Sequence, residues 1–202
     1  MIVKFEVSEQ VFGLFPNPVL GVVIGSIEEA LPALDQRATE MRQKALDDLL
    51  ASEIEVANIV SHVNVSTWRS AYQAFGVKAK TYKPTHESYI RRLLKDEELP
   101  RSINPIVDIY LANQVRHVLP HGGYDASTLA GTVKLDVASA GEEFHPLRGG
   151  TESVNSGEII YRDDVRVLTR RWNYEDNDAT KITDETSQFV LVIESPSSEI
   201  PV

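Results

Sequence analysis

Hydrophobic and polar positions change their spacing several times along the chain. Residues 2–7 alternate in the manner of a strand, and the apolar run VLGVVIGSI at 19–27 suits a strand buried on both faces. From residue 27 to about residue 50, apolar positions recur at intervals of three and four. This spacing predicts an amphipathic helix with its acidic side in water, which Pro32 could kink.

Three further helices are predicted before residue 121. The stretches 65–76 and 85–100 read as short helices. A third helix is predicted from Asn104, a suitable N-cap, and Pro105 would occupy its first position. Pro120 would stop this helix at its far end.

The second half of the chain is predicted to be mostly strands. Short alternating stretches, separated by Gly, Asp and Asn, read GTVKLDVA, EEFHPL, GEIIYRD, VRVLTRRWN and SQFVLVIE. Helices therefore cluster before a β-rich half. We expect an α+β fold over residues 1–202, as a single three-layer domain with a β-rich, sandwich-like core and helices packed on one side.

Composition narrows the chemistry. The chain of 202 residues contains no cysteine, which excludes disulfides, thiol catalysis and thiolate metal sites. It has no apolar run of about 18 residues and no export signal at its start. We therefore expect a soluble, cytoplasmic protein without a membrane partner.

The net charge of -10 argues against a protein that coats nucleic acid, and no DNA partner is expected. The charge is unevenly distributed, however. Residues 66–92 contain six basic residues and a single acid, Glu87. This stretch could form a local basic face, or it could consist of ordinary solvated helix surfaces.

Common catalytic motifs are absent. There is no phosphate-binding loop, dinucleotide fingerprint or GxSxG motif. His117 and His121 have a spacing that could hold a metal on one helix face, but Pro120 breaks the helix between them. Neither a metal site nor a cofactor is expected.

The stretch LPHGGYD at 119–125 is a candidate functional corner. Gly122 and Gly123 would permit a positive φ and would let a ligand approach main-chain N–H groups, while Tyr124 and Asp125 could anchor the turn. Alternatively, the stretch is only a helix stop with a tyrosine packed into the core.

The stretch TRRWNYEDN at 169–177 joins arginines to Trp172 and Asn173 at a predicted strand end. It could hold a carboxylate or phosphate with stacking, or it could be an amphipathic strand with a half-buried tryptophan. The late carboxylate Glu194 is suited to an ammonium group or to ordering a water.

Read in order, several stretches resemble the tRNA-editing domain, called B-three/B-four, of the bacterial phenylalanyl-tRNA synthetase beta subunit, and most of all its free-standing relatives. They are WRSAYQAFG, SYIRRLLKDEELPRSINPIVDIYLANQ, LPHGGYD, AGEEFHPL, NSGEIIYRDD, TRRWNYEDN and FVLVIE. The core of the resemblance covers residues 61–195, and residues 1–60 resemble the N-terminal strands and long helix of the free-standing branch.

The resemblance implies an aminoacyl-tRNA deacylase. Such a domain binds mischarged aminoacyl-tRNA and hydrolyses its ester in trans with an ordered water, without a metal. The basic stretch 66–92 would supply the RNA surface. The alternatives are a non-catalytic module that binds a small molecule or an amino acid in the same pocket, and an interaction domain without a ligand.

The resemblance also implies a set of site residues. The synthetase motif aligns without gaps on SINPIVD and LPHGGYD, so that its histidine falls on Gly122 and the neighbouring His121 could substitute for it. The implied catalytic residues are His121, Gly122 and Gly123. The implied substrate-binding residues are Asn104, Tyr124, Arg171, Trp172, Asn173 and Glu194.

Overall fold

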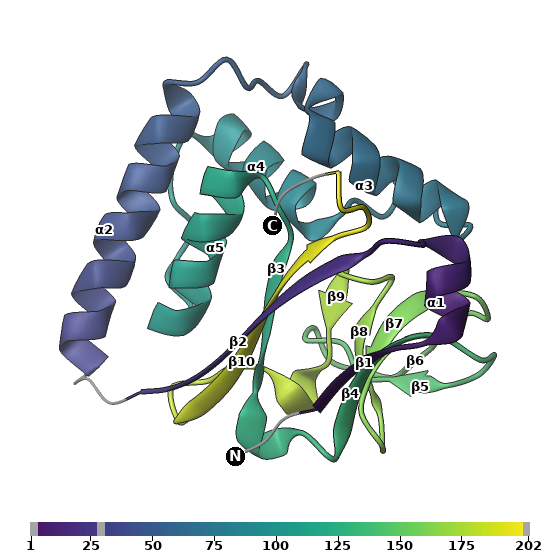
Figure 1. Ribbon diagram of the computed structural model, residues 1–202. Helices are drawn as coiled ribbons and strands as arrows, with labels where there is room; N and C mark the ends of the chain where they lie inside the picture. Colours follow the sequence, from purple (N-terminus) through teal and green to yellow (C-terminus); the bar gives the residue numbers. More distant parts are fainter. Residues whose placement is uncertain (1–3, 28–30, 200–202) are drawn as a thin grey trace.

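The computed structural model describes residues 4–27 and 31–199, arranged as helices, a three-stranded sheet and a five-stranded sheet in successive layers (Figure 1). The helices are α1 (Glu9–Leu14), α2 (Leu31–Leu50), α3 (Val63–Ala74), α4 (Thr85–Asp96) and α5 (Pro105–His117), with short 3-10 turns η1 (Ile59–Ser61), η2 (Ala126–Thr128) and η3 (Asp178–Thr180). The strands are β1 (Lys4–Val7), β2 (Val19–Ser26), β3 (His121–Asp125), β4 (Thr132–Val137), β5 (Glu143–Phe144), β6 (Glu152–Ser153), β7 (Ile159–Arg162), β8 (Val167–Arg170), β9 (Glu175–Asp176) and β10 (Gln188–Ser195).

Two sheets enclose the main core. The larger sheet has the order β1-β4-β7-β8-β9, with β1 parallel to β4 and the other pairs antiparallel. The smaller sheet has the order β2-β10-β3 and is antiparallel throughout. Helices α2 and α5 lie on the outer side of the smaller sheet (Figure 1). The α+β prediction is therefore confirmed.

Aromatic side chains fill the space between the sheets. The rings of Trp68 on α3 and Trp172 meet edge to face with centroids 4.9 Å apart, and Phe15 meets Trp172 at the same distance. Both tryptophans are fully buried. Large buried rings of this kind supply much of the burial that stabilises a core, and here they fix α3 and the turn after β8 in one position.

The predicted helices are confirmed, with small changes at their ends. Asn104 caps α5, because its Oδ1 accepts a hydrogen bond of 2.9 Å from the N–H of Ile106, and Pro105 is the first helical residue. The helix ends before Pro120. Its C-cap is Val118, which adopts the left-handed conformation with φ 53°.

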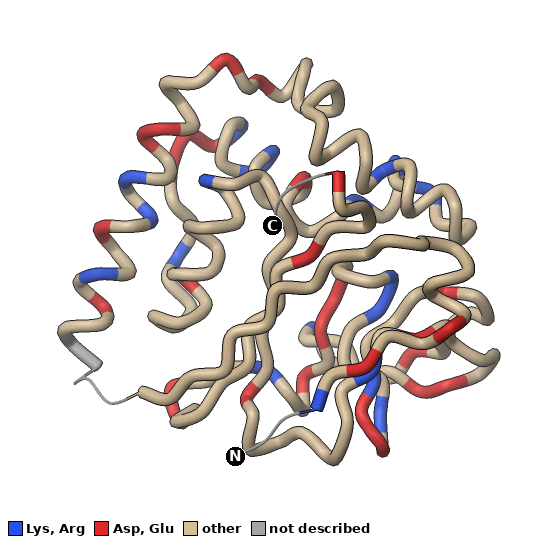
Figure 2. The backbone as a smooth tube through the Cα atoms, in the orientation of Figure 1, with Lys and Arg blue, Asp and Glu red and all other residues tan. Residues whose placement is uncertain are grey.

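Two predictions for the first part of the chain are corrected. The predicted start of the long helix falls partly on residues 28–30, outside the described residues, and Pro32 lies in the first turn of α2, where its missing N–H does not interrupt the helix. The stretch 19–27 is not buried on both faces, because β2 is an edge strand whose central residues are exposed. Charges of both signs line α2 (Figure 2), and Lys44 pairs with Asp48 at 3.0 Å.

The prediction of a turn at LPHGGYD is wrong as well. Residues 121–125 form strand β3, paired with β10, instead of a turn. The left-handed residue that reverses the chain is Val118, and neither Gly122 nor Gly123 has a positive φ.

Short elements α1, β6 and β9 were not predicted, since they are too brief to show a hydrophobic period. In the described residues, no helix is both long and apolar enough to cross a membrane.

Candidate functional site

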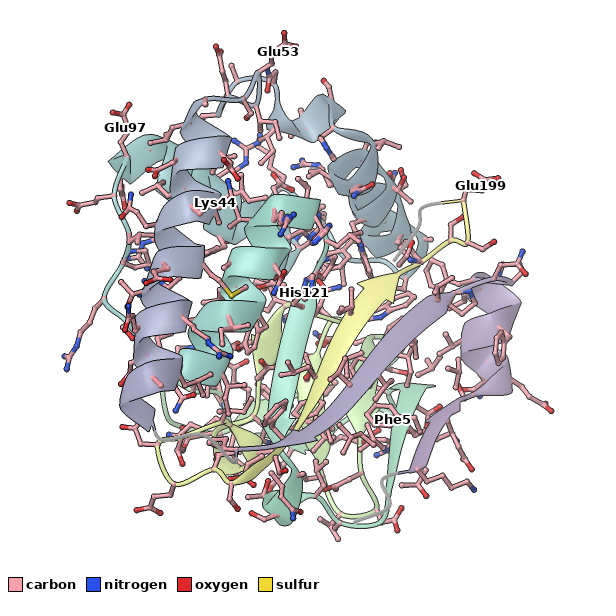
Figure 3. The ribbon with its side chains drawn as sticks, turned by 60° about the vertical axis from the view of Figure 1, so that its left-hand side comes forward. Phe5, Lys44, Glu53, Glu97, His121 and Glu199 are labelled. Atoms are coloured by element: carbon pink, nitrogen blue, oxygen red, sulfur yellow. The ribbon has the colours of Figure 1, made fainter. Side chains whose placement is uncertain are left out.

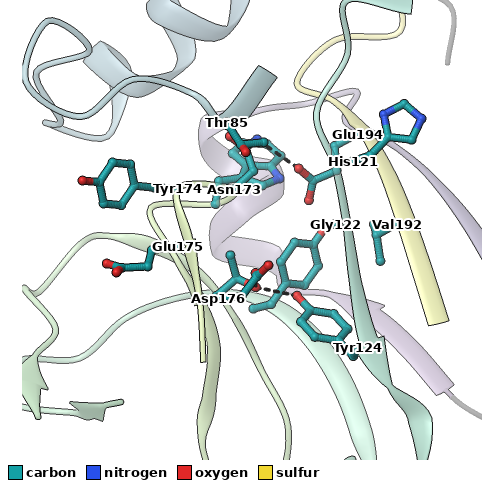
Figure 4. Close-up of a pocket in the computed structure, with 13 residues that line it drawn as sticks. Thr85, His121, Gly122, Tyr124, Asn173, Tyr174, Glu175, Asp176, Val192 and Glu194 are labelled. Carbon is teal, nitrogen blue, oxygen red and sulfur yellow. Dashed lines mark hydrogen bonds between the residues drawn. The ribbon is translucent and has the colours of Figure 1, made fainter. Parts of the chain in front are cut away.

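A small polar cavity lies between β3, β10, the end of the larger sheet and the start of α4 (Figure 4). Its water-sized space is about 40 Å³, enough for a few water molecules. The residues that line it are Thr85, His121, Gly122, Tyr124, Tyr161, Thr169, Trp172, Asn173, Tyr174, Glu175, Asp176, Val192 and Glu194. Six of the nine residues implied by the resemblance are therefore around one cavity.

Glu194 is buried at one side of this cavity. Its Oε2 accepts a hydrogen bond of 2.9 Å from Asn173 Nδ2, and Asn173 Oδ1 accepts one of 2.9 Å from the hydroxyl of Tyr72. Burial raises the pKa of Glu194 to about 8, although Asn173 and nearby polar groups of Tyr161 and Trp172 lower it. Glu194 is therefore mostly protonated, and so mostly neutral, at neutral pH.

A strained turn places Asn173 next to Glu194. Arg171 and Trp172, directly after β8, both have positive φ angles, of 47° and 66°. Such conformations are costly for residues with bulky side chains. They are held because the Trp172 N–H donates to Ile159 O at 2.6 Å and because the Trp172 ring is locked in the core. The turn buries Trp172 in the core. It also aims the amide of Asn173 at Glu194 (Figure 4).

Asp176 is a second carboxyl group at the cavity. Its Oδ1 accepts a hydrogen bond of 2.7 Å from Thr169 Oγ1, and this hydroxyl lies 2.6 Å from that of Tyr124. Because Thr169 uses its proton for Asp176, the hydroxyl of Tyr124 donates to Thr169. Burial raises the pKa of Asp176 to about 6, while the bond from Thr169 lowers it. Asp176 is therefore mostly ionised above neutral pH.

His121 lies at the rim of the cavity, at the start of β3 near the end of α5 (Figure 3). Its ring Nδ1 donates to the carbonyl of Leu119 at 2.9 Å, and burial lowers its pKa, so the ring is neutral. Alternate strand residues face opposite sides, so the ring lies on the face opposite Gly122 and Tyr124. Figure 4 shows it turned away from Asp176. The ring is therefore poorly placed to position a water at the cavity centre.

Gly122 and Gly123 face opposite sides of β3. A Cβ atom on Gly122 would meet nothing within 4 Å, whereas one on Gly123 would lie 2.6 Å from Leu191 Cδ2. Glu194 N donates to Pro120 O, and His121 N donates to Gln114 on α5. Main-chain N–H groups along an edge strand point alternately toward the neighbouring strand and away from it, and the N–H of His121 points away from β10. The N–H of Gly122 therefore points toward β10. It is thus committed to the sheet, contrary to the expectation of a free donor.

Three residues implied by the resemblance do not line the cavity. Asn104 caps α5, and its Nδ2 donates a hydrogen bond of 3.0 Å to Asp184 Oδ1. Gly123 packs against Leu191. The guanidinium of Arg171 lies over the ring of Tyr82, 3.9 Å from its centroid. Asn104 and Gly123 thus support the local fold. Arg171 is buried next to the cavity.

The sequence pattern did not single out Asp176 and Thr169, which the structure places at the cavity. Both lie within the stretch TRRWNYEDN, but a carboxylate in a polar stretch gives no sign of burial. The sequence feature that could have indicated Thr169 is the alternation of side chains along β8, which places this residue on one face of the strand. The pairing of β8 with β9 then brings Asp176 opposite Thr169.

The histidine pair considered from the sequence does not form a metal site of its own. His117 is an exposed residue at the end of α5, and His121 belongs to β3. Across residues 4–27 and 31–199, no three His, Asp or Glu side chains are grouped so that they could hold a metal ion.

Comparisons with known proteins identify the family. Comparison with curated proteins gives no match. Among solved structures, the chain is similar to an N-terminal fragment of the phenylalanyl-tRNA synthetase beta subunit from Pyrococcus horikoshii, with 11% identity and a TM-score of 0.49, over 98% of this chain. The chain spans only 45% of that structure's length. The model of the B3/4 domain matches residues 67–200, about two thirds of the chain. The chain therefore belongs to the B3/4 domain family, as its resemblance predicted.

Proposed function

We propose that this domain binds the aminoacyl end of a charged tRNA in the cavity and hydrolyses the ester in trans with an ordered water. One observation carries the proposal. Two buried or half-buried carboxyl groups with raised pKa values, Glu194 and Asp176, line one small cavity together with the amide of Asn173. Perturbed carboxyl groups that share a polar cleft are typical of acid–base sites.

Asp176 is suited to act as the general base. Thr169 holds its Oδ1, so Oδ2 is the oxygen that can take a proton from a water in the cavity. The water oxygen then adds to the acyl carbon while Asp176 takes its proton. The bond from the acyl carbon to the ribose oxygen breaks, and the ribose oxygen receives the proton. The products are the free amino acid and the tRNA.

Glu194 is suited to binding instead of proton abstraction. A protonated carboxyl group can donate one hydrogen bond and accept another, so it can recognise a polar group of the aminoacyl moiety. Asn173 fixes its orientation through the bond to Oε2. Because Glu194 is mostly neutral at neutral pH, it does not compete with Asp176 for the role of base.

The ester carbonyl oxygen needs hydrogen-bond donors as its negative charge develops. The N–H of Gly122 cannot serve as one, because it pairs with β10. Helix α4 begins at Thr85, which lines the cavity, and its N-cap Pro84 offers no side-chain acceptor. The first-turn N–H groups of a helix carry partial positive charge and lack partners within the helix. We assign them and the Thr85 hydroxyl to the developing oxyanion.

A second function is favoured by the charge of the cavity. Glu175 and Asp176 line it beside the mostly neutral Glu194, and no lysine or arginine is among the lining residues. This lining suits an ammonium group, so the same cavity could bind a free amino acid or a small amine without hydrolysis. Calorimetry with free amino acids, in the absence of tRNA, tests this function. Saturable heat without any deacylation would support the binding module.

The proposed hydrolysis is tested with a panel of aminoacyl-tRNAs that carry aromatic and aliphatic amino acids. We expect the full chain to release at least one amino acid faster than the control without enzyme. A panel in which every rate equals that control would remove the hydrolytic function.

A further inference from the structure

A loop beside the cavity carries three lysines, of which Lys83 donates to the main-chain oxygen of Lys80 at 3.2 Å. Residues 75–84 connect α3 to α4 and contain Lys78, Lys80 and Lys83. The sequence has no acidic residue between Glu55 and Glu87, although the whole chain has a net charge of -10. Figure 2 shows basic positions at and near α3. This loop is thus a local positive surface on an acidic protein.

The other basic residues of the 66–92 stretch are engaged. Arg69 Nη1 and Arg91 Nε both donate to Glu87 Oε1, at 2.7 and 2.8 Å. Arg92 lies 3.6 Å from Asp96. In contrast, none of the three loop lysines forms an ion pair with a carboxylate in the described part of the chain. The expected RNA surface therefore reduces to the loop.

An aromatic cluster connects this loop to the cavity. The half-buried rings of Tyr82, on the loop, and Tyr174 meet with centroids 5.3 Å apart. The guanidinium of Arg171 lies over both rings, 3.9 and 5.1 Å from their centroids, and also pairs with Glu158 at 3.6 Å. Tyr174 lines the cavity itself. Tyr82, Arg171 and Tyr174 thus form a continuous rigid platform that reaches from the loop to the cavity.

A groove runs past this platform. It has a volume of about 470 Å³ and is lined by residues of the loop and by the turn before β7, including Lys78, Tyr82 and Arg171. Its acidic residue, Glu158, is buried and paired with Arg170 at 2.6 Å. The groove is therefore positive or neutral along its length, unlike the acidic cavity beside it.

We propose that this loop and platform bind the single-stranded 3′ end of an RNA, with an unpaired base stacked on Tyr82 or Tyr174 and the phosphates next to Lys78, Lys80 and Lys83. Aromatic rings that lie beside cations in a groove bind single strands through stacking and charge, with little dependence on sequence. The inference rests on the proposed function. The strand would enter along the groove and present its aminoacyl ester to the cavity, which Tyr174 borders.

Binding of uncharged tRNA, measured by fluorescence anisotropy, tests this proposal without any hydrolysis. Three probes are compared: intact tRNA, the same tRNA without its single-stranded 3′ end, and that single strand alone. We expect the full chain to bind the intact tRNA and the single strand, and to bind the truncated tRNA at least about tenfold more weakly. Equal affinity for intact and truncated tRNA would overturn the proposal.

Substitutions locate the surface. Replacing Lys78, Lys80 and Lys83 with alanine should weaken binding and reduce the slope of log affinity against log salt by about 2, because each phosphate contact contributes about 0.7 for a single strand. The matched control replaces Lys44, Lys95 and Lys181, with the same change of net charge. An equal loss in both triple variants would show that only total charge matters, and the proposed site would then be wrong.

A conservative pair of substitutions tests the platform. Tyr82→Phe keeps the ring and should bind the single strand like the original protein. Tyr82→Leu keeps an apolar side chain but removes the stacking surface, so it should bind about tenfold more weakly. If both bind alike, Tyr82 is not part of the site. Loss of binding in Tyr82→Leu, with hydrolysis of a small aminoacyl ester unchanged, would separate the platform from the catalytic cavity.

Discussion

Gly122 is the residue whose environment most clearly separates a functional role from a structural one. It lies in β3 with an ordinary φ, and the space beyond its missing Cβ opens into the cavity. We predict that Gly122→Val fills the cavity and abolishes ligand binding and deacylation. The thermal unfolding midpoint should change little, since a β-branched residue suits a strand. Activity and melting temperature measured on one sample decide this. A fully active Gly122→Val protein would contradict it.

The neighbouring glycine provides the matched control. A Cβ on Gly123 would lie 2.6 Å from Leu191 Cδ2, 2.9 Å from Ile182 Cδ1 and 3.2 Å from the main-chain oxygen of Val190. Gly123→Val should therefore lower the free energy of unfolding by about 1–3 kcal/mol, as expected for overpacking. Urea unfolding measures this loss. If Gly122→Val is the less stable of the two variants, the assignment of the two faces of β3 is wrong.

The protonation of Glu194 predicts a pH dependence of stability. Its pKa is about 8 in the folded protein, against an ordinary value of 4.5. Between these values the folded state holds a proton that the unfolded chain has lost, so this residue makes folding less favourable as pH rises from 4.5 to about 8. Glu194→Gln keeps a neutral side chain and removes this term.

Urea unfolding of both proteins at about pH 5 and about pH 9 measures the effect. The variant should gain stability relative to the original protein as the pH rises, because only the original protein must either keep a proton or bury a charge. A stability difference that stays constant over this range would show that Glu194 is ionised in the fold.

At the scale of secondary structure elements, Glu87 fixes α4 to α3 and so positions Thr85 at the cavity. Its fully buried carboxylate accepts bonds from Arg69 and Arg91. We predict that Glu87→Gln lowers the free energy of unfolding by about 1–3 kcal/mol, because it leaves two guanidinium groups without their anion. Asp96→Asn is the control: Asp96 pairs with exposed Arg92, and its loss should cost less than about 1 kcal/mol. Equal effects in urea unfolding would contradict the prediction.

The helices were predictable from the sequence because their signals are local. Asn104 followed by Pro105 fixes the start of α5 through one capping bond and one preset φ angle. Strand β3 was not predictable in the same way. The residues of LPHGGYD favour a turn by composition, and only pairing with β10, far along the chain, makes them a strand.

At the scale of the whole molecule, the fold brings together residues that no spacing in the sequence connects. Glu194, Trp172 and Gly122 come from separate elements, and only the fold brings them around one cavity. The orientation of His121 and the position of Asp176 at the cavity could not be predicted, since both depend on strand register and on the strained turn at Arg171 and Trp172. The charge of the stretch 66–92 also depends on the fold, because the buried Glu87 pairs with two of its six basic residues, Arg69 and Arg91.

The central claim is that Asp176 and Glu194 act together at this cavity as base and neutral donor, and the pH dependence of deacylation tests it most directly. After subtraction of the rate without enzyme, the rate should be bell-shaped, with limbs near the pKa values of about 6 for Asp176 and about 8 for Glu194. Asp176→Asn should lower the rate about 10²–10⁴-fold and remove the acidic limb, whereas Asp178→Asn, outside the cavity, should leave the profile unchanged. A profile that Asp176→Asn does not alter would contradict the account.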